Sequence, residues 1–437
     1  MKTVFFFVVT LFIFQSVECG RLQLDISASS AILINADSGS VLYEKNADAK
    51  SYPASLTKIA TCLYALKANS KDINRAVTCT PECLRLMKKS TKIARSYSCP
   101  SFYLEPDGTH YMIQPKEKIA FKDLLFGLML SSGNDAANCI AHEIGGNIPN
   151  FMQGMNYYLK ELGCKNTQFN NPHGLHHPGH FSTARDIALI TAEAIKVDLI
   201  KDIVSTKQHM RMATNLQPFK IVNTKNLLLK PGKYFYPGAI GMKTGYHSDA
   251  QHTFSGVVHK DGRTLIAVVL GCKDSANQCF QDVVRMFDAA FNEEKETRIL
   301  FNSAENVFKR SVKGAKQSLE AKLLNNIEIS YYPSEECDYT IELNWDYKEA
   351  PIGKGAILGS LNIYDKKRNA ISSAALEAVD NVQLTKFAYI KNCATKMFRF
   401  DKGFAIGAFF TIAVILLVSS LCLGCSKLIL KGKKINK

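Results

Sequence analysis

Short apolar runs separated by turn residues predict several strands between about residues 28 and 298. The run 31–35 stops at a cluster of Asp, Ser and Gly, and a second run, 41–44, follows it directly, which predicts a hairpin. Residues 264–271 form an uninterrupted apolar run, as expected for a strand that is buried on both faces.

Helical periodicity occupies the segments between these strands. Apolar positions on one face predict a helix over 59–68, a pair of helices within 121–144 that meet near Ser132, and a last helix over 283–291. Because strands and helices are interspersed along one chain, the pattern indicates an α/β or α+β fold.

The pattern changes near residue 299, where alternation of apolar and polar residues replaces the helical spacing. Three segments alternate in this way, at 326–332, 339–343 and 356–364, and Pro and Gly residues separate them. We therefore expect one domain over 21–298 and a small all-β domain over 299–383.

Each end of the chain carries an apolar segment with its own meaning. Residues 4–14 follow a single lysine and are too few to cross a bilayer, so 1–20 are predicted to be a secretory signal peptide. Residues 403–425 carry no charge and are long enough to span, which predicts a transmembrane helix. A buried core helix of that length at that position fits the pattern poorly.

Basic residues flank the predicted transmembrane helix on both sides. The tail 426–437 holds five lysines and no acidic residue, which favours a cytoplasmic end. The linker 384–402 interleaves Lys and Arg with aromatic residues, and either a collar on anionic lipid headgroups or a solvated linker explains it. The sequence predicts a single-pass envelope protein whose domains face outward.

The predicted signal peptide and transmembrane helix change how the composition and the net charge of the chain are interpreted. The 437 residues are 46% hydrophobic, so the chain can bury a core, and a disordered or collagen-like polymer is excluded. A formal charge of +15 would suggest nucleic-acid binding inside a cell, but an exported chain meets an anionic envelope instead. We expect membrane lipids as partners and no nucleic acid.

Thirteen cysteines raise the question of disulfides. Cys62 and Cys139 lie on apolar helix faces and are expected to be buried thiols. Pairs within the enlarged basic loop 79–99, and the pair Cys272 with Cys279, are candidate disulfides, although pairing cannot be deduced from sequence.

Three short polar motifs stand out, and each has an ordinary explanation when it occurs alone. Ser55 and Lys58 are three residues apart, so on a helix their side chains can meet, yet most such pairs are a cap and a solvated lysine. Residues 132–134 alone would cap a helix, and residues 243–245 alone would form a turn. A lysine acts as a base only where burial or a nearby cation lowers its pKa.

Together and in this order the motifs read S-x-x-K, S-x-N and K-T-G, a set typical of β-lactamases and penicillin-binding proteins. Residues 169–188, which include the letters N-P-H-G-L, are also similar to low-molecular-mass penicillin-binding proteins of the D-alanyl-D-alanine carboxypeptidase family. The resemblance covers most of residues 28–383. It implies a β-lactamase/transpeptidase-like domain with an antiparallel sheet flanked by helices, attached to the bacterial inner membrane on its periplasmic side.

The resemblance also implies an activity: removal of the terminal D-alanine from the peptidoglycan stem peptide, and covalent capture by β-lactam antibiotics, with no cofactor and no metal. Carried over, Ser55 is the acylating nucleophile, Lys58 is its general base, and Ser132 relays the proton to the leaving amine. The other residues bind substrate: Asn134 holds the peptide, Lys243 keeps the site cationic, Thr244 binds the terminal carboxylate, Gly245 lets substrate lie against the strand, and Tyr246 shares the oxyanion hole with Ser55.

Departures from the family pattern leave the reaction class open. An arginine often receives the substrate carboxylate, whereas the corresponding neighbourhoods here offer Lys225, Lys273 and Gln278. A lysine lacks the bidentate fork of arginine, so a D,D-endopeptidase and a transpeptidase stay as alternatives. A β-lactamase is disfavoured because no E-x-x-L-N occurs between the second and third motifs. A non-enzymatic wall-binding protein would have lost part of the motif set.

Four histidines crowd residues 173–180 and raise the possibility of a metal. No cysteine or acidic residue at zinc-ligand spacing accompanies them, and prolines make the stretch a loop. We interpret His173, His176, His177 and His180 as packing or surface residues and predict no metal site.

Overall fold

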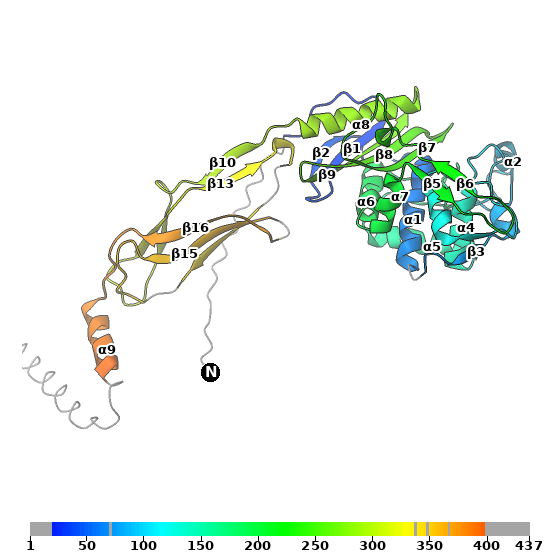
Figure 1. Cartoon of the computed structure of the whole chain (residues 1–437). Helices are drawn as coiled ribbons and strands as arrows, with labels where there is room; N and C mark the ends of the chain where they lie inside the picture. Colours follow the sequence, from blue (N-terminus) through cyan, green and yellow to red (C-terminus); the bar gives the residue numbers. More distant parts are fainter. Residues whose placement is uncertain (1–19, 70–71, 336–338, 347–348, 366–367, 398–437) are drawn as a thin grey trace, which may run out of the picture. The chain divides into compact units, whose positions relative to one another are not determined.

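The computed structural model describes residues 20–397 except 70–71, 336–338, 347–348 and 366–367 (Figure 1). The predicted transmembrane helix, the tail and nearly all of the predicted signal peptide lie outside the described residues. Among the described residues, no helix combines the length and the hydropathy needed to cross a bilayer. The chain forms two compact units, one mainly of residues up to Glu296 together with Ser330–Cys337, and one of Thr297–Ile329 and the residues from Asp338 onward.

The larger unit is built on a five-stranded antiparallel sheet in the order β2-β1-β9-β8-β7. The predicted hairpin is confirmed as β1 and β2, and the predicted apolar strand is the core of β9. The five strands are β1 (Ser30–Asn35), β2 (Val41–Lys45), β7 (Ala239–His247), β8 (Gln251–Lys260) and β9 (Arg263–Cys272).

Helices cover both faces of this sheet, which explains the uninterrupted apolar run of β9. Ile266 and Val268 pack into one core with the main helical group, while Leu265 and Ala267 pack into a second core under α8 (Ala276–Phe291). Side chains of a strand alternate between faces, so both faces need apolar residues. The main group comprises α1 (Thr57–Ala68), α3 (Phe121–Met129), α4 (Asn134–Gly145), α5 (Ile148–Glu161), α6 (Ala184–Ala194) and α7 (Asp198–Ser205).

The last helix of this unit begins earlier than the expected 283. Ser275 caps it, because its side chain accepts a hydrogen bond from the N–H of Gln278. A disulfide between Cys272 and Cys279 joins the end of β9 to the first turns of α8, so this candidate pair is confirmed.

The other cysteine predictions concern two buried thiols and possible disulfides within the loop 79–99. Cys62 and Cys139 are buried free thiols, as expected. Cys79, Cys83 and Cys99 are also free, so the candidate disulfides within the loop 79–99 are wrong. Cys79 and Cys83 are buried in the main core, and Cys83 Sγ lies 3.3 Å from Thr80 Oγ1.

Short elements complete the larger unit on the side of the main helical group. They are the helix α2 (Lys89–Ala94) and two ribbons, β3 (Ala76–Thr78) with β4 (Lys118–Ala120), and β5 (Gln208–Arg211) with β6 (Lys220–Asn223). Figure 1 shows α2 within this unit, in the insertion that the sequence marked as an enlarged loop.

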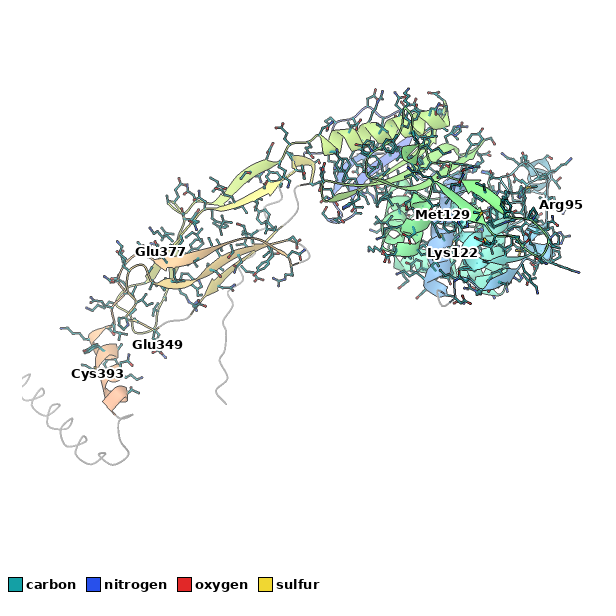
Figure 2. The ribbon with its side chains drawn as sticks, in the orientation of Figure 1. Arg95, Lys122, Met129, Glu349, Glu377 and Cys393 are labelled. Carbon is teal, nitrogen blue, oxygen red and sulfur yellow. A yellow bond between two sulfur atoms is a disulfide. The ribbon has the colours of Figure 1, made fainter. Side chains whose placement is uncertain are left out.

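The smaller unit is β-rich, as the alternating pattern predicts, with a sheet in the order β11-β12-β16-β15-β14 and a two-stranded ribbon β10-β13. Glu377 of β16, labelled in Figure 2, forms an ion pair of 3.2 Å with Lys322 of β12. The elements are β10 (Glu296–Phe301), β11 (Val307–Arg310), β12 (Leu319–Leu323), β13 (Ile327–Tyr331), β14 (Thr340–Trp345), β15 (Ile357–Tyr364), β16 (Ala370–Ala378) and the helix α9 (Lys386–Met397). The exact domain boundaries stay predictions.

Candidate active site

The first motif places a hydroxyl and an amine in contact at the start of α1. Ser55 lies in the short 3-10 turn that leads into the helix, and Lys58 lies one turn on, completely buried. Lys58 Nζ is 2.9 Å from Ser55 Oγ, 2.7 Å from Asn134 Oδ1 and 2.6 Å from the carbonyl oxygen of His173. All three partners are neutral, so among the residues that the structure describes no contact of this amine compensates a positive charge.

The second motif brings another hydroxyl to the same point. Ser132 stands between α3 and α4 with φ of 64°, a left-handed conformation that is unfavourable for a residue with a Cβ. Its Oγ is 2.9 Å from Ser55 Oγ. Ser55 Oγ therefore lies between the amine of Lys58 on α1 and a hydroxyl from the connection between α3 and α4.

The third motif lies within the edge strand β7 and not in a turn before a strand. Lys243 is buried, and Thr244 and Gly245 follow it along the strand toward Ser55. A Cβ on Gly245 would lie 2.9 Å from the backbone nitrogen of Ser55 and 2.5 Å from Thr253 Oγ1. The glycine thus lets β7 approach the backbone of Ser55. This close approach requires a glycine more strictly than the predicted role, in which Gly245 lets substrate lie against the strand.

The electrostatics favour a neutral amine next to Ser55. Burial, together with the positive charges of Lys243 and Lys225, holds the pKa of Lys58 well below its usual value. Burial and the charge of Lys225 lower the pKa of Lys243 to about 7. The charge of Asp135 opposes this effect on Lys58, but its carboxylate accepts hydrogen bonds from the N–H groups of Tyr111 and Ile113 at 2.7 and 3.1 Å and so is directed at the backbone.

Ser55 opens onto two adjoining cavities that share Thr109 and Tyr246. One, of about 310 Å³, is also lined by Ser132, Lys225, Thr244 and several apolar side chains. The other, of about 280 Å³, is more polar, and its lining includes Glu105, Asp107, His176 and His247. We call Ser55, Lys58, Ser132 and Lys243 the inner cluster, because the first three are in hydrogen-bond contact and the charge of Lys243 acts on Lys58.

Sequence reasoning missed two contributors to the site. The carbonyl of His173 accepts a hydrogen bond from Lys58, and Thr109 lines both cavities and accepts a hydrogen bond from the N–H of Asn134 through its carbonyl. The resembling segment 169–188 signalled the first contact, and nothing signalled the second. Of the three substitutes for the expected arginine, Lys225 lines a cavity and Lys273 is exposed. Gln278, on α8, donates hydrogen bonds to Ser27 Oγ and to Asp282 Oδ1.

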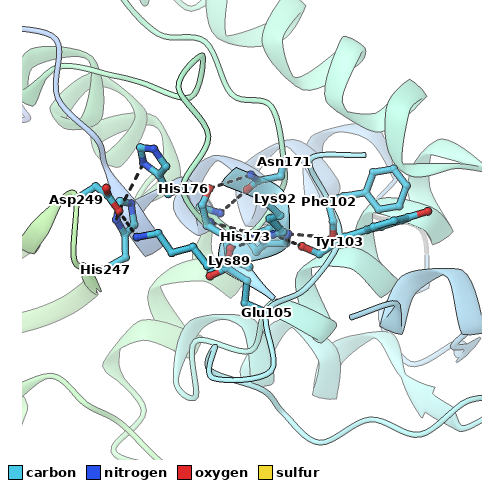
Figure 3. A network of polar contacts seen from close by, with 12 residues as sticks. Lys89, Lys92, Phe102, Tyr103, Glu105, Asn171, His173, His176, His247 and Asp249 are labelled. Atoms are coloured by element: carbon cyan, nitrogen blue, oxygen red, sulfur yellow. Dashed lines mark hydrogen bonds and ion pairs between the residues drawn. The ribbon is translucent and has the colours of Figure 1, made fainter. Parts of the chain in front are cut away.

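A second polar network surrounds the more polar cavity (Figure 3). The amine of Lys92 is 3.0 Å from Glu105 Oε1, and the amine of Lys89 is 2.5 Å from Asp249 Oδ2. We call these four residues, together with His176 and His247, the rim cluster. Burial opposes the charged form of Lys89, but the hydrogen bond and the charge of Asp249 outweigh it and raise the pKa of this amine.

The four crowded histidines have different roles. His173 and His180 are buried and fully engaged, His173 with the carbonyl of Phe102 and the N–H of Leu175, and His180 with Thr57 and the N–H of Asn170. These two are packing residues, as interpreted. His176 instead faces His247 and Asp249, which come from the end of β7 and the turn after it.

Burial keeps the imidazoles of the rim cluster neutral. It lowers the pKa of His247 to about 4, with the neighbouring His176 adding to the effect, and it also lowers the pKa of His176. Asp249, despite some burial, keeps a pKa of about 2 because Lys89 donates a hydrogen bond to it.

Comparisons with known proteins agree with this geometry. A family described as D-alanyl-D-alanine carboxypeptidase matches residues 17–274. The D-alanyl-D-alanine carboxypeptidase DacF of Bacillus subtilis is 33% identical over 84% of this chain and 88% of its own length. DacA of Haemophilus influenzae, with the same description, is 28% identical over 84% of this chain and 88% of its own length.

Solved structures lead to the same family. Penicillin binding protein 5 from Haemophilus influenzae superposes with a TM-score of 0.56 at 26% identity, over 83% of this chain and all of that one. The Streptomyces K15 DD-transpeptidase superposes with a TM-score of 0.54 at 26% identity, over 62% of this chain and 99% of that one. The penicillin-binding, transpeptidase-like α+β fold is thereby confirmed. The family match spans more than half of the sequence and includes all three motifs that meet at Ser55, so this chain belongs to the D-alanyl-D-alanine carboxypeptidase family.

Proposed function

We propose that this protein is a serine-type D-alanyl-D-alanine carboxypeptidase that trims peptidoglycan stem peptides through an acyl-enzyme on Ser55. One observation carries the proposal: Ser55 Oγ lies 2.9 Å from the buried amine of Lys58 and 2.9 Å from Ser132 Oγ. This is the arrangement of an activated nucleophile with a base and a proton relay within hydrogen-bond reach.

In the acylation step, Ser55 Oγ attacks the carbonyl carbon of the penultimate D-alanine and passes its proton to the neutral Lys58 amine. The oxyanion that forms is stabilised by the backbone N–H groups of Ser55 and Tyr246, and one such donor contributes about 10²–10³ in rate. The proton then passes through Ser132 to the nitrogen of the terminal D-alanine, whose C–N bond breaks. The products are the ester on Ser55 and free D-alanine.

Water completes the cycle. It attacks the ester carbonyl, gives one proton to the same amine, and the C–O bond to Ser55 breaks as the serine hydroxyl is restored. A β-lactam acylates Ser55 in the same way, but its leaving nitrogen stays tethered to the acyl group and obstructs this water. Penicillin should therefore remain bound covalently.

Substrate binding follows from the charges around the larger cavity. Thr244 and Lys225 line it and would receive the terminal carboxylate of the stem peptide. Lys225 takes the place of the arginine that often binds this group, as a point charge. The side chain of Asn134 orients Lys58 through its Oδ1 and leaves its amide nitrogen to hold the substrate backbone.

Localisation in the proposal rests on the ends of the chain. A signal peptide at 1–20 would export the protein, and the helix at 403–425 would anchor it in the bacterial inner membrane with the active site outside. The last described helix, α9, supports contact with lipid, because Phe387 is 80% exposed and Ile390 is 66% exposed beside basic residues.

Labelling with a fluorescent penicillin tests the nucleophile. The wild type and Ser38→Ala, a matched change in the exposed turn between β1 and β2, should both become labelled, whereas Ser55→Ala should not. An unlabelled wild type would contradict the enzyme proposal, and a labelled Ser55→Ala would contradict the assignment of Ser55.

Digestion of a stem pentapeptide tests the reaction class. Release of free D-alanine with formation of a tetrapeptide is expected. A cross-linked dimer formed with an added amine acceptor would make the protein a transpeptidase, and cleavage of an existing cross-link would make it an endopeptidase.

A further inference from the structure

Three potential metal ligands converge at the edge of the polar cavity. One nitrogen each from His176 and His247 and one oxygen of Asp249 all lie within 4.8 Å of one another. Asp249 Oδ2 is 3.9 Å from His176 Nδ1 and 3.6 Å from His247 Nδ1. With bonds of about 2.1 Å and tetrahedral angles, the donors of a zinc site stand about 3.4 Å apart. The separations from Asp249 Oδ2 exceed this value by about 0.5 Å or less, and the two nitrogens, which lie within 4.8 Å of each other, would approach by up to about 1.4 Å when a metal binds.

The two imidazoles are held in place by aromatic neighbours. The ring of His176 packs edge-on against Tyr52 at 4.6 Å between centroids and against Tyr97 at 5.7 Å. His247 packs against Tyr52 at 6.2 Å and against His176 at 5.5 Å. A site whose ligands are fixed by packing loses less conformational entropy on binding a metal.

His176 Nδ1 provides an independent indication of a ligand. This atom is buried and makes no hydrogen bond within the part of the chain that the structure describes. A buried nitrogen without a partner is costly, and a metal ion is one way to satisfy it. His247 Nδ1 accepts a hydrogen bond of 3.1 Å from the N–H of Ala250, which a metal on that atom would displace.

The ammonium group of Lys89 already contacts Asp249, the acidic residue of this group of three ligands. The amine of Lys89 lies 2.5 Å from Asp249 Oδ2 and 2.7 Å from Ser248 Oγ. Lys89 belongs to α2, whereas His176 belongs to the loop before α6 and the other two ligands follow the K-T-G motif. A metal would replace one cation by another and would connect two walls of the cavity.

We propose that His176, His247 and Asp249 form a binding site for a divalent transition metal of the zinc class at the edge of the active-site cleft. Two imidazoles and one carboxylate suit zinc, whereas calcium and magnesium prefer oxygen ligands. Three protein ligands leave the fourth position for water from the cavity. The site lies outside the inner cluster, and its two histidines line the polar cavity.

Binding of Zn²⁺ alone to the purified full chain tests the proposal, with affinity measured by calorimetry. His247→Gln should weaken binding by at least about tenfold, the lower limit for disturbing even the outer shell of a metal site. Lys89→Met should strengthen it, because no ammonium then has to leave Asp249. These opposite directions cannot both come from misfolding.

Two controls separate this site from other zinc-binding groups. His177→Gln removes the adjacent histidine, which does not face Asp249, and should leave the affinity unchanged. Co²⁺ used as a probe should show ligand-field bands without the sulfur charge-transfer band of a thiolate site. Equal affinity in the wild type and His247→Gln, weaker binding in Lys89→Met, or a thiolate spectrum would each overturn the proposal.

Discussion

The inner cluster and the rim cluster both contribute residues to two adjoining cavities, and each contains a buried lysine, but these two lysines have opposite partners. Lys58 contacts a hydroxyl, an amide oxygen and a carbonyl oxygen, all neutral. Lys92, which is equally inaccessible, contacts the carboxylate of Glu105. Burial without a counter-ion favours the neutral amine, whereas burial with one maintains an ion pair. The partner therefore decides whether a buried lysine can act as a base.

The largest expected effect is on Lys58. Lys58→Met removes the base while retaining an apolar stem of similar length, and the rate of acylation by fluorescent penicillin should fall by about 10²- to 10⁴-fold. Lys92→Met is the matched control in the rim cluster. A comparable fall in the acylation rate of both variants would show that the difference between the neutral partners of Lys58 and the carboxylate partner of Lys92 does not affect catalysis.

In protein stability, unlike in the acylation rate, the large effect is expected from Lys92→Met in the rim cluster. It leaves Glu105 as a buried charge without its partner, which costs about 3–5 kcal/mol of the free energy of unfolding. Denaturant unfolding of the full chain measures this. The double variant Lys92→Met with Glu105→Leu should recover most of the loss, and no recovery would mean that packing, and not charge, is responsible.

A change in pH profile is the next largest effect. Acylation needs neutral Lys58, so it is lost as the pH falls through the pKa of that amine. It also needs cationic Lys243, so it declines again as the pH rises above about 7. The charge of Lys225 lowers both pKa values, so Lys225→Met should move both limbs to higher pH.

The exposed Lys273 supplies a control for that profile. Lys273→Met removes a charge of the same sign outside both cavities. The acidic and alkaline limbs of the pH profile for penicillin acylation should stay at the same pH as in the wild type. Limbs that do not move in Lys225→Met, or that move to lower pH, would contradict the electrostatic account of the inner cluster.

The smallest effect is expected at Lys89. Its ion pair with Asp249 is partly exposed, at 31% and 35% of the two side chains, and such pairs contribute about 0–1 kcal/mol. Lys89→Met should therefore change the free energy of unfolding by less than about 1 kcal/mol in the absence of added metal. A loss as large as that of Lys92→Met would remove the distinction between exposed and buried pairs.

The sequence by itself determined the elements and the motif contacts that depend on local geometry. A spacing of three residues at the start of a helix brings Lys58 within reach of Ser55 through local geometry alone. The hairpin of β1 and β2 follows from apolar runs divided by turn residues, and the buried strand β9 follows from an uninterrupted apolar run. The alternating strands of the smaller unit follow from a period of two residues. The predictions for 1–20 and 403–425 stay predictions.

Only the tertiary structure decided which distant residues meet. The stretch around His176 has no zinc-ligand spacing of its own, and the ligand atoms that lie near this histidine belong to His247 and Asp249. In the same way, the pairing of Lys92 with Glu105, the contact between Gly245 and Ser55, and the left-handed backbone of Ser132 depend on how helices pack against the sheet. The periodicity of apolar residues predicts which side chains of one helix or strand share a face. Contacts between elements depend on the packing of the whole core.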